Sequence, residues 1–302
     1  MIYRSLIQFF ITVLLFASSL ANAEDKLVVY TVNYPLQYFA QRIAGEQAEV
    51  ILPMPADIDP AFWQPDAKDI ANLQQADVIF LNGAGYAKWL NRVSLPRRKL
   101  VNTSAGFSDR YIKITEGVTH SHGREGDHSH AGTAFTTWLD FTQAIEQAKA
   151  ITQVFSRLRP ESKDVFERNL VMLEQALLDL DKQVHNIIAS DPDKALVASH
   201  PVYQYLKRRY GLHLESVMWE PDEVANEAGW SELALMLKMS SAKWMVWESE
   251  PNAENIAKLQ SMGVESLVFN PCGNRPVTGD FLSVMQQNLR ELKRSYTQGT
   301  SK

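Results

Sequence analysis

Residues 27–52 read LVVYTVNYPLQYFAQRIAGEQAEVIL, and their order of apolar and amphipathic segments indicates the class of fold. Leu27 to Thr31 form a short apolar run that is typical of a buried strand, and Pro35 to Ala44 follow with apolar residues at helical spacing. Gly45 ends the helix, and Glu49 to Leu52 form a second short strand. A strand, a helix and a strand in this order predict a parallel sheet with a right-handed crossover.

The same alternation continues on both sides of a helical middle section. Further strands are expected at 76–81, 99–102, 195–198, 214–218, 244–247 and 266–269, and further helices at 66–75, 202–210 and 280–296. Residues 140–190 are almost wholly helical and divide at Pro160, a residue suited to the first turn of a helix. Beyond it, apolar side chains recur every three or four positions, at Phe166, Leu170, Leu173, Leu177, Leu180, Val184 and Ile187.

This pattern predicts an α/β protein with two lobes, each a parallel sheet flanked by helices, joined by one long bridging helix. The expected lobes are residues 24–141, which include a His-rich loop at 119–130, and residues 191–302, with a helical connection at 142–190. The helix from Pro160 to Ala189 would be about 45 Å long, enough to pack on both lobes.

The N-terminus differs in kind from the rest of the chain. Arg4 is the only charged residue before Glu24, residues 6–20 are mostly apolar, and Ala21-Asn22-Ala23 matches a cleavage site. This pattern predicts a cleaved secretory signal peptide over residues 1–23 and therefore a periplasmic protein. A membrane anchor is the alternative, but the apolar stretch is shorter than the roughly 20 residues that span a bilayer.

Composition narrows the classes of function. The chain has 302 residues, 45% of them hydrophobic and 22% charged, which is typical of a globular protein with a large core. The net charge is −5 and the sequence has no clustered basic run, so it does not predict a nucleic-acid-binding surface. Cys272 is the single cysteine, so no internal disulfide can form. We expect a monomer whose partners do not include nucleic acid.

Histidine clustering is the strongest chemical signal. Four of the seven histidines lie within eleven residues, at His120, His122, His128 and His130, separated by a short acidic and Gly-containing spacer. Neutral imidazole is a common ligand of Zn²⁺ and similar cations, and His-rich tracts indicate metal binding. The alternative is a solvated polar loop, since residues 115–132 show no apolar periodicity.

Other candidate ligands follow the strands of the second half. His200 comes after the strand 195–198, and Glu248 and Glu250 come after the strand 244–247. Ligands of open parallel sheets bind outside the carboxyl ends of the strands, so these side chains are candidates for a metal site. The carboxylates can equally be helix caps, and the same two interpretations apply to Glu220 and Asp222. No P-loop, HExxH, CxxC or GxSxG motif nominates an enzyme, and we expect none.

Four segments, in order, resemble the periplasmic substrate-binding proteins of zinc- and manganese-type ABC transporters. They are Asp59-Pro60-x-x-x-x-Pro65, Ala76-Asp77-Val78 with Gly83 to Leu90, Trp138-Leu139-Asp140, and Ser199 to Tyr205 with Arg209 to Leu212. The resemblance covers about residues 26 to 295. It implies two lobes bridged by a long rigid helix, a metal held between them, and delivery to a membrane permease.

The resemblance carries over only one of the family's usual ligands. His200 is retained, whereas the other positions fall on Ala61, Thr136 and Asn270. Three explanations stay open: a site rebuilt from His200, Glu248 or Glu250 and the loop histidines; another ligand in a cleft lined by Trp63, Phe62, Trp138 and Trp219; or a protein that no longer transports. We expect capture of a divalent transition metal, Zn²⁺ or else Mn²⁺, for an ABC-type importer; the alternative is a periplasmic metal chaperone or interaction module.

Overall fold

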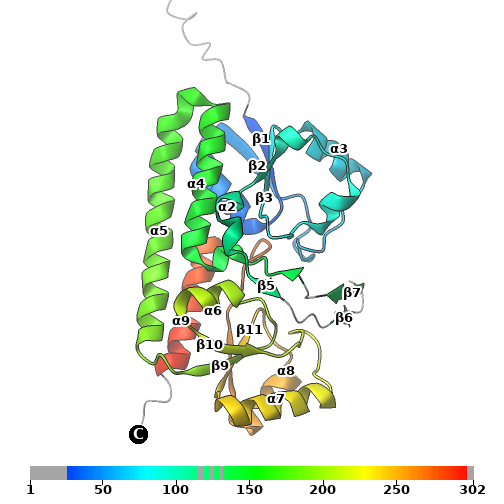
Figure 1. Cartoon of the computed structure of the whole chain (residues 1–302), viewed down its shortest axis with the longest axis vertical. Helices are drawn as coiled ribbons and strands as arrows, with labels where there is room; N and C mark the ends of the chain where they lie inside the picture. The colour runs from blue at the N-terminus through cyan, green and yellow to red at the C-terminus, as the bar shows by residue number, and fades with distance from the viewer. Residues whose placement is uncertain (1–25, 115–118, 123–125, 130–131, 298–302) are drawn as a thin grey trace, which may run out of the picture.

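Two parallel sheets and a pair of long helices make up the molecule. The computed structural model describes residues 26–114, 119–122, 126–129 and 132–297, and for 119–122 and 126–129 it describes the backbone alone. One sheet is built from the first third of the chain and the other from the last third, with the long helices running along one side of both (Figure 1).

The first sheet forms around the strand that opens the described chain. Its strands in spatial order are β2 (Ala48–Ile51), β1 (Leu27–Thr31), β3 (Val78–Leu81) and β4 (Leu100–Asn102), all parallel. α2 (Tyr34–Ala44) connects β1 to β2, and α3 (Ala67–Gln75) precedes β3. The side chain of Asn33 accepts a hydrogen bond from the Leu36 amide at 3.1 Å and so caps the start of α2.

The second sheet repeats this strand order. Its strands are β10 (His213–Ser216), β9 (Ala195–Ala198), β11 (Trp244–Trp247) and β12 (Glu265–Val268), again all parallel. Its helices are α6 (Gln204–Tyr210), α7 (Glu227–Ser240), α8 (Ala253–Ser261) and α9 (Phe281–Thr297). In both sheets the first strand of the chain lies between the second and the third, so the two sheets share one topology.

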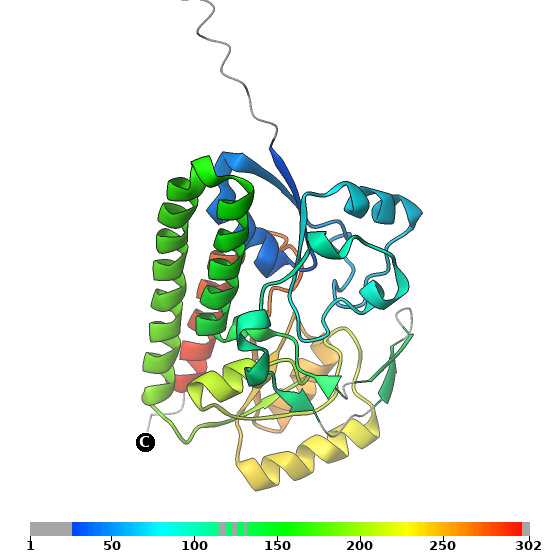
Figure 2. The ribbon, with the colours of Figure 1, turned by 45° about the horizontal axis from the view of Figure 1, so that its top comes forward.

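Two helices connect the sheets. α4 (Phe141–Leu158) leads through a short turn into α5 (Lys163–Ala189), which at 27 residues is about 40 Å long. α5 packs against α2 and α4 at one end and against α6 and α9 at the other, and Figure 2 shows α4, α5 and α9 along one side of the molecule. The expected α/β fold with a long bridging helix is confirmed. Ile188 rather than Ile187 is the buried residue at the end of its apolar stripe.

One hydrophobic core runs through both sheets. It includes Val29 and Phe80 of the first sheet, Leu177 of α5, and Leu196 and Val246 of the second sheet. The alternate residues of the second sheet face the other way and form a smaller cluster with α7 and α8. Because the same core contacts both sheets, moving one sheet against the other would disturb close-packed side chains.

Residues 115–132 and 227–240 differ most clearly from the sequence prediction. Residues 115–132, expected as a loop, contain the antiparallel strands β6 (Thr119–His122) and β7 (Gly126–Ser129), and β5 (Lys113–Ile114) pairs with β8 (Gly132–Thr133). These strands could not be predicted from the sequence, because the segment is polar and has no alternation of apolar and polar residues. α7 was not expected either, because Leu235 and Met239 are exposed and weaken its apolar periodicity.

Short 3₁₀ turns complete the described secondary structure, at Gly45–Gln47, Lys88–Arg92, Arg97–Lys99, Ala105–Arg110, Thr137–Leu139 and Pro160–Ser162. Within the described ranges, none of the helices combines the length and the apolar composition that crossing a bilayer requires.

Neighbouring leucines of α5 provide a test of the shared core. Leu177 is fully buried, whereas Leu178 is 42% exposed. Leu177→Ala should lower the free energy of unfolding by about 2–5 kcal/mol, because it removes buried methylenes and leaves a cavity between the helices and the sheets. Leu178→Ala is the matched control and should cost well under half as much. Urea unfolding followed by circular dichroism measures both, and equal losses would contradict the proposed packing of α5.

Candidate functional site

Three neighbouring strands of the second sheet end beside one another. His200 follows β9, Glu248 follows β11 directly, and Glu220 lies four residues beyond β10. Backbone hydrogen bonds extend the pairing past the strands: the amide of Trp219 donates to the carbonyl of Ser199 at 2.7 Å, and the amide of Ser199 donates to the carbonyl of Val246 at 2.9 Å. Since the strands are parallel, their carboxyl ends bring these three side chains to the same edge.

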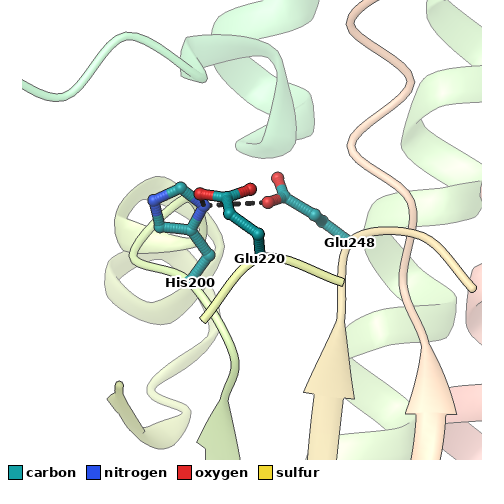
Figure 3. Close-up of side chains that lie close together, drawn as sticks. All are labelled: His200, Glu220 and Glu248. Atoms are coloured by element: carbon teal, nitrogen blue, oxygen red, sulfur yellow. Dashed lines mark hydrogen bonds and ion pairs between the residues drawn. The ribbon is translucent and has the colours of Figure 1, made fainter. Parts of the chain in front are cut away.

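His200, Glu220 and Glu248 form a compact group (Figure 3). The Nδ1 atom of His200 lies 2.9 Å from Oε1 of Glu248 and 3.5 Å from Oε1 of Glu220. One potential ligand atom from each residue lies within 4.8 Å of the other two. The side chains are 11%, 22% and 23% exposed respectively, so the group is largely shielded but open on one side.

The charges in this group act strongly on the imidazole. Burial by itself would lower the pKa of His200, because it disfavours the charged ring. The hydrogen bond and the charge of Glu248, followed by the charges of Glu220 and Asp59, outweigh burial and raise the pKa above the ordinary value of 6.5. The electrostatics therefore favour a positive charge at the position between the imidazole and the two carboxylates.

A divalent cation meets the same requirement. One imidazole nitrogen and two carboxylate oxygens are ordinary ligands of Zn²⁺ and of other first-row metals. The separations within the group allow a single ion to reach all three donors at bond lengths near 2.0–2.2 Å after small side-chain adjustments. Because Nδ1 is the ring nitrogen that faces both carboxylates, a metal there would replace the proton of the imidazolium.

The loop that carries His200 is held in place from both sides. The hydroxyl of Thr136 donates to the carbonyl of Val202 at 2.6 Å, and the hydroxyl of Tyr203 donates to the carbonyl of Phe269 at 2.8 Å. α6 follows immediately, and its Arg209 donates to the carboxylate of Asp181 on α5 through Nε at 3.0 Å and Nη2 at 2.9 Å. The position of the imidazole is thus tied to the long bridging helix.

A cavity of about 900 Å³ opens in front of the group. One wall comes from the loops after the strands of the second sheet, and the opposite wall comes from residues 56–62 and 84–88, which belong to the first-sheet half. Phe62 and Trp138 line this cavity. Trp63 and Trp219, which the sequence also suggested as cleft residues, instead pack in the core against other tryptophans.

The residues at the positions where the family resemblance implied further ligands have structural roles instead. Ala61 is buried in the main core, and Thr136 uses its hydroxyl to hold the loop after His200. The side-chain oxygen of Asn270 accepts a hydrogen bond from the Cys272 amide at 2.6 Å and shapes the loop after β12. Burial raises the pKa of the Cys272 thiol to about 12, so it stays protonated and is a poor ligand.

The structure brings together only some of the residues that the sequence suggested. His200 and Glu248 lie in the group, whereas Glu250 is exposed and lies outside it. His120, His122 and His128 lie on β6 and β7, where the backbones of His120 and His128 are directly opposite, and their side chains are not described. His130 lies outside the described residues.

Glu220 is the member of the group that the predicted metal set left out. Its position after a strand made it a candidate, but a capping carboxylate has the same sequence pattern. Backbone hydrogen bonds from Val217 and Trp219 to the end of β9 continue the strand pairing beyond the last residue of β10. This continued pairing brings Glu220 close to His200.

Comparisons with known proteins agree with this architecture. Residues 29–295 match the family model described as "Zinc-uptake complex component A periplasmic". The chain is 28% identical over 296 residues to the zinc-binding lipoprotein AdcA of Streptococcus pneumoniae (strain ATCC BAA-255 / R6), over 93% of this chain and 58% of AdcA, so it spans less than two thirds of that relative. It is 29% identical over 288 residues to the high-affinity zinc uptake system protein ZnuA of Bacillus subtilis (strain 168), over 90% of this chain and 88% of ZnuA.

Solved structures show the same fold. The metal-dependent lipoprotein YcdH of Bacillus subtilis superposes with a TM-score of 0.77 at 25% identity, over 89% of this chain and 99% of YcdH. The Zn(II)-bound ZnuA-like domain of Streptococcus pneumoniae AdcA superposes with a TM-score of 0.76 at 24% identity, over 90% of this chain and all of that domain. Taken with the family match over most of its length, the chain belongs to the family of periplasmic zinc-uptake complex component A proteins.

Proposed function

We propose that this protein captures a divalent transition metal, zinc foremost, and delivers it to the membrane permease of an ABC-type importer. The observation that carries the proposal is the group of His200, Glu220 and Glu248 at the cavity between the two sheets. The names of the relatives, a zinc-binding lipoprotein and a zinc uptake system protein, support the same function. Export through a cleaved signal peptide at residues 1–23 is part of this proposal.

The electrostatics of the group support metal capture over a purely structural role. Two carboxylates lie near one imidazole nitrogen, in a partly buried place where their mutual repulsion is poorly screened. A proton on His200 relieves part of this repulsion, and a divalent ion would relieve more of it. The group is also open to the cavity, as an exchangeable cargo requires.

The histidines at 120, 122, 128 and 130 are proposed as an auxiliary source of ligands. They lie in the segment between β5 and β8, and residues of both these strands line the cavity. Imidazoles near the cavity would raise the local concentration of metal and could complete its coordination. Glu250 has no such support, because it is exposed and lies outside the group, and we propose Glu248 as the ligand from this segment.

The ligand proposal predicts different effects for the two sets of histidines. His200→Ala should weaken zinc binding roughly tenfold or more, because it removes the only nitrogen donor of the described group. Replacing His120, His122, His128 and His130 together by Ser should weaken it less if these residues are auxiliary. Glu248→Gln should also weaken zinc binding, and Glu250→Gln is its matched control. Competition with a fluorescent zinc chelator measures the affinity of each variant. Unchanged affinity in His200→Ala and Glu248→Gln would disprove the proposed site.

The raised pKa of His200 predicts how zinc binding depends on pH. Zinc must displace the proton from the imidazole, so the affinity should begin to fall while the pH is still above 6.5. If one proton competes, the fall is about tenfold per pH unit below that pKa. Titration of zinc affinity between pH 5.5 and 8.5 measures this, and a midpoint below 6.5 would contradict the assigned environment of His200.

The metal-free protein should show the opposite dependence in its stability. Because the folded-state pKa is raised, the charged imidazole stabilises the fold fully below the unfolded pKa near 6.5, and this contribution is lost as the pH rises through the folded pKa. Urea unfolding of metal-free wild type and of His200→Gln at several pH values measures the difference, which should shrink from pH 6 to pH 8.5.

The shared core predicts that metal binding causes little closure. The main core includes residues of both sheets, and α5 and α9 pack against elements of both halves, so a wide hinge motion would break close packing. Small-angle scattering should therefore give nearly the same radius of gyration with and without zinc. A marked compaction on adding zinc would show that the two sheets move apart more freely than their packing suggests.

A further inference from the structure

The three donors of the group leave part of a metal's coordination open toward the cavity. His200, Glu220 and Glu248 all follow strands of the second sheet. Within the described ranges, no further His, Cys, Asp or Glu offers an atom at the same short distances from all three. Zinc in proteins takes four ligands and in some sites five. An ion held by these three side chains therefore keeps a coordination position for a ligand that comes from the cavity.

The cavity is much larger than that position requires. Its volume is about 900 Å³. A water molecule takes only about 30 Å³ in the liquid, whereas pockets for small organic ligands usually enclose about 300–1,000 Å³. The space in front of the group thus has the size that a small organic molecule would fill together with the ion.

Aromatic rings form part of the cavity lining. Phe62 and Phe135 are partly exposed there, whereas Tyr86 and Trp138 are buried. The ring of Tyr86 packs edge-on against Phe135, with centroids 5.1 Å apart, and against Trp138, with centroids 5.8 Å apart. Nε1 of Trp138 donates to the carbonyl of Pro271 at 2.7 Å. These contacts hold the rings as a fixed surface on which another flat ring can pack.

The charges around the cavity restrict the kind of molecule that can enter with a metal. Among the described residues, six carboxylates line it, and they are Asp57, Asp59, Glu220, Asp222, Glu223 and Glu248. A cleft lined mainly by one sign of charge attracts the opposite sign. A chelator with several negative charges, such as citrate, would be repelled even while it holds a metal. A chelator that binds through neutral nitrogen atoms leaves the complex positive.

Lys88 adds a positive group to the same lining. This side chain is exposed, and its Nζ atom lies over the ring of Phe62, 4.9 Å from the ring centroid. An ammonium group beside an aromatic ring can bind a molecule that has both a carboxylate and a flat ring. An amino acid with an imidazole ring combines these two features with nitrogen atoms that bind metals.

We propose that the cavity takes the metal as a complex with a small nitrogen-donor amino acid of the histidine type, rather than as the bare ion. This inference rests on the proposed function and names the chemical form of its cargo. The three donors of the group bind the metal, and nitrogen atoms of the chelator complete its coordination. The aromatic surface contacts the ring of the chelator, and Lys88 contacts its carboxylate.

Equilibrium dialysis of the full chain against radiolabelled L-histidine, with and without Zn²⁺, tests this inference. We expect about one histidine to be retained per bound zinc ion, and none without zinc. The histidines at 120, 122, 128 and 130 would compete for the same coordination position. The variant in which all four are replaced by Ser should therefore retain histidine at least as well as the wild type.

Two substitutions in the cavity lining test the assigned contacts. Phe135→Leu removes a ring but keeps an apolar side chain, and Lys88→Met removes the ammonium group. At saturating zinc, each should weaken histidine retention about fivefold. Lys68→Met is the matched control, because Lys68 is an exposed lysine of α3 outside the cavity lining. Elemental analysis measures the zinc content of each sample, and circular dichroism checks that each variant is folded.

The outcomes separate this inference from the proposed function. Zinc bound without histidine, in both the wild type and the variant without the four histidines, would overturn the inference and leave the proposed function intact. Histidine retained only in that variant would assign the open position to the chain's own imidazoles, and histidine retained without zinc would indicate a separate amino-acid site; either result would also overturn the inference. A chain that binds zinc neither alone nor with histidine would remove the proposed function itself.

Discussion

The parallel pairing of β9 with β10 and β11 is the constraint on which the site depends. It brings His200, Glu220 and Glu248 to one edge of the sheet, although they are separated by up to 48 residues in the chain. The backbone geometry forces two carboxylates and an imidazole into a partly buried space where like charges repel. Such a group is satisfied only when a positive charge lies among its members, and either a proton or a metal ion can supply it.

The second requirement is that both walls of the cavity keep their places. The main core and α5 hold the two sheets together, and the hydrogen bonds of Asn274 and Arg275 join the loop after β12 to the turn at 54–59. Little conformational entropy of the protein is then lost when the ion binds, which increases the affinity of a rigid site. The ion pair of Arg209 with Asp181 extends the same support to the loop that carries His200.

The sequence contained most of the fold, because buried strands and amphipathic helices leave periodic apolar patterns. It contained less of the site. His200 and Glu248 follow apolar strands closely, so their position at the sheet edge could be predicted. Glu220 could not be separated from a helix cap, because its place depends on backbone pairing beyond β10 that has no sequence signature. The sequence also did not predict the polar ribbon of β6 and β7 or helix α7, because neither repeats apolar residues at a regular period.

The last helix has a consequence for how the chain acquires its structure. Phe281, at the start of α9, is buried against Tyr38 and Phe39 of α2, with ring centroids 5.7 Å and 5.3 Å apart. Most of the chain separates these partners in sequence. A chain that is synthesised from its N-terminus cannot cover this aromatic surface until synthesis is nearly finished. Contacts between residues so distant in sequence form late, so this face of α2 stays exposed until the last helix reaches it.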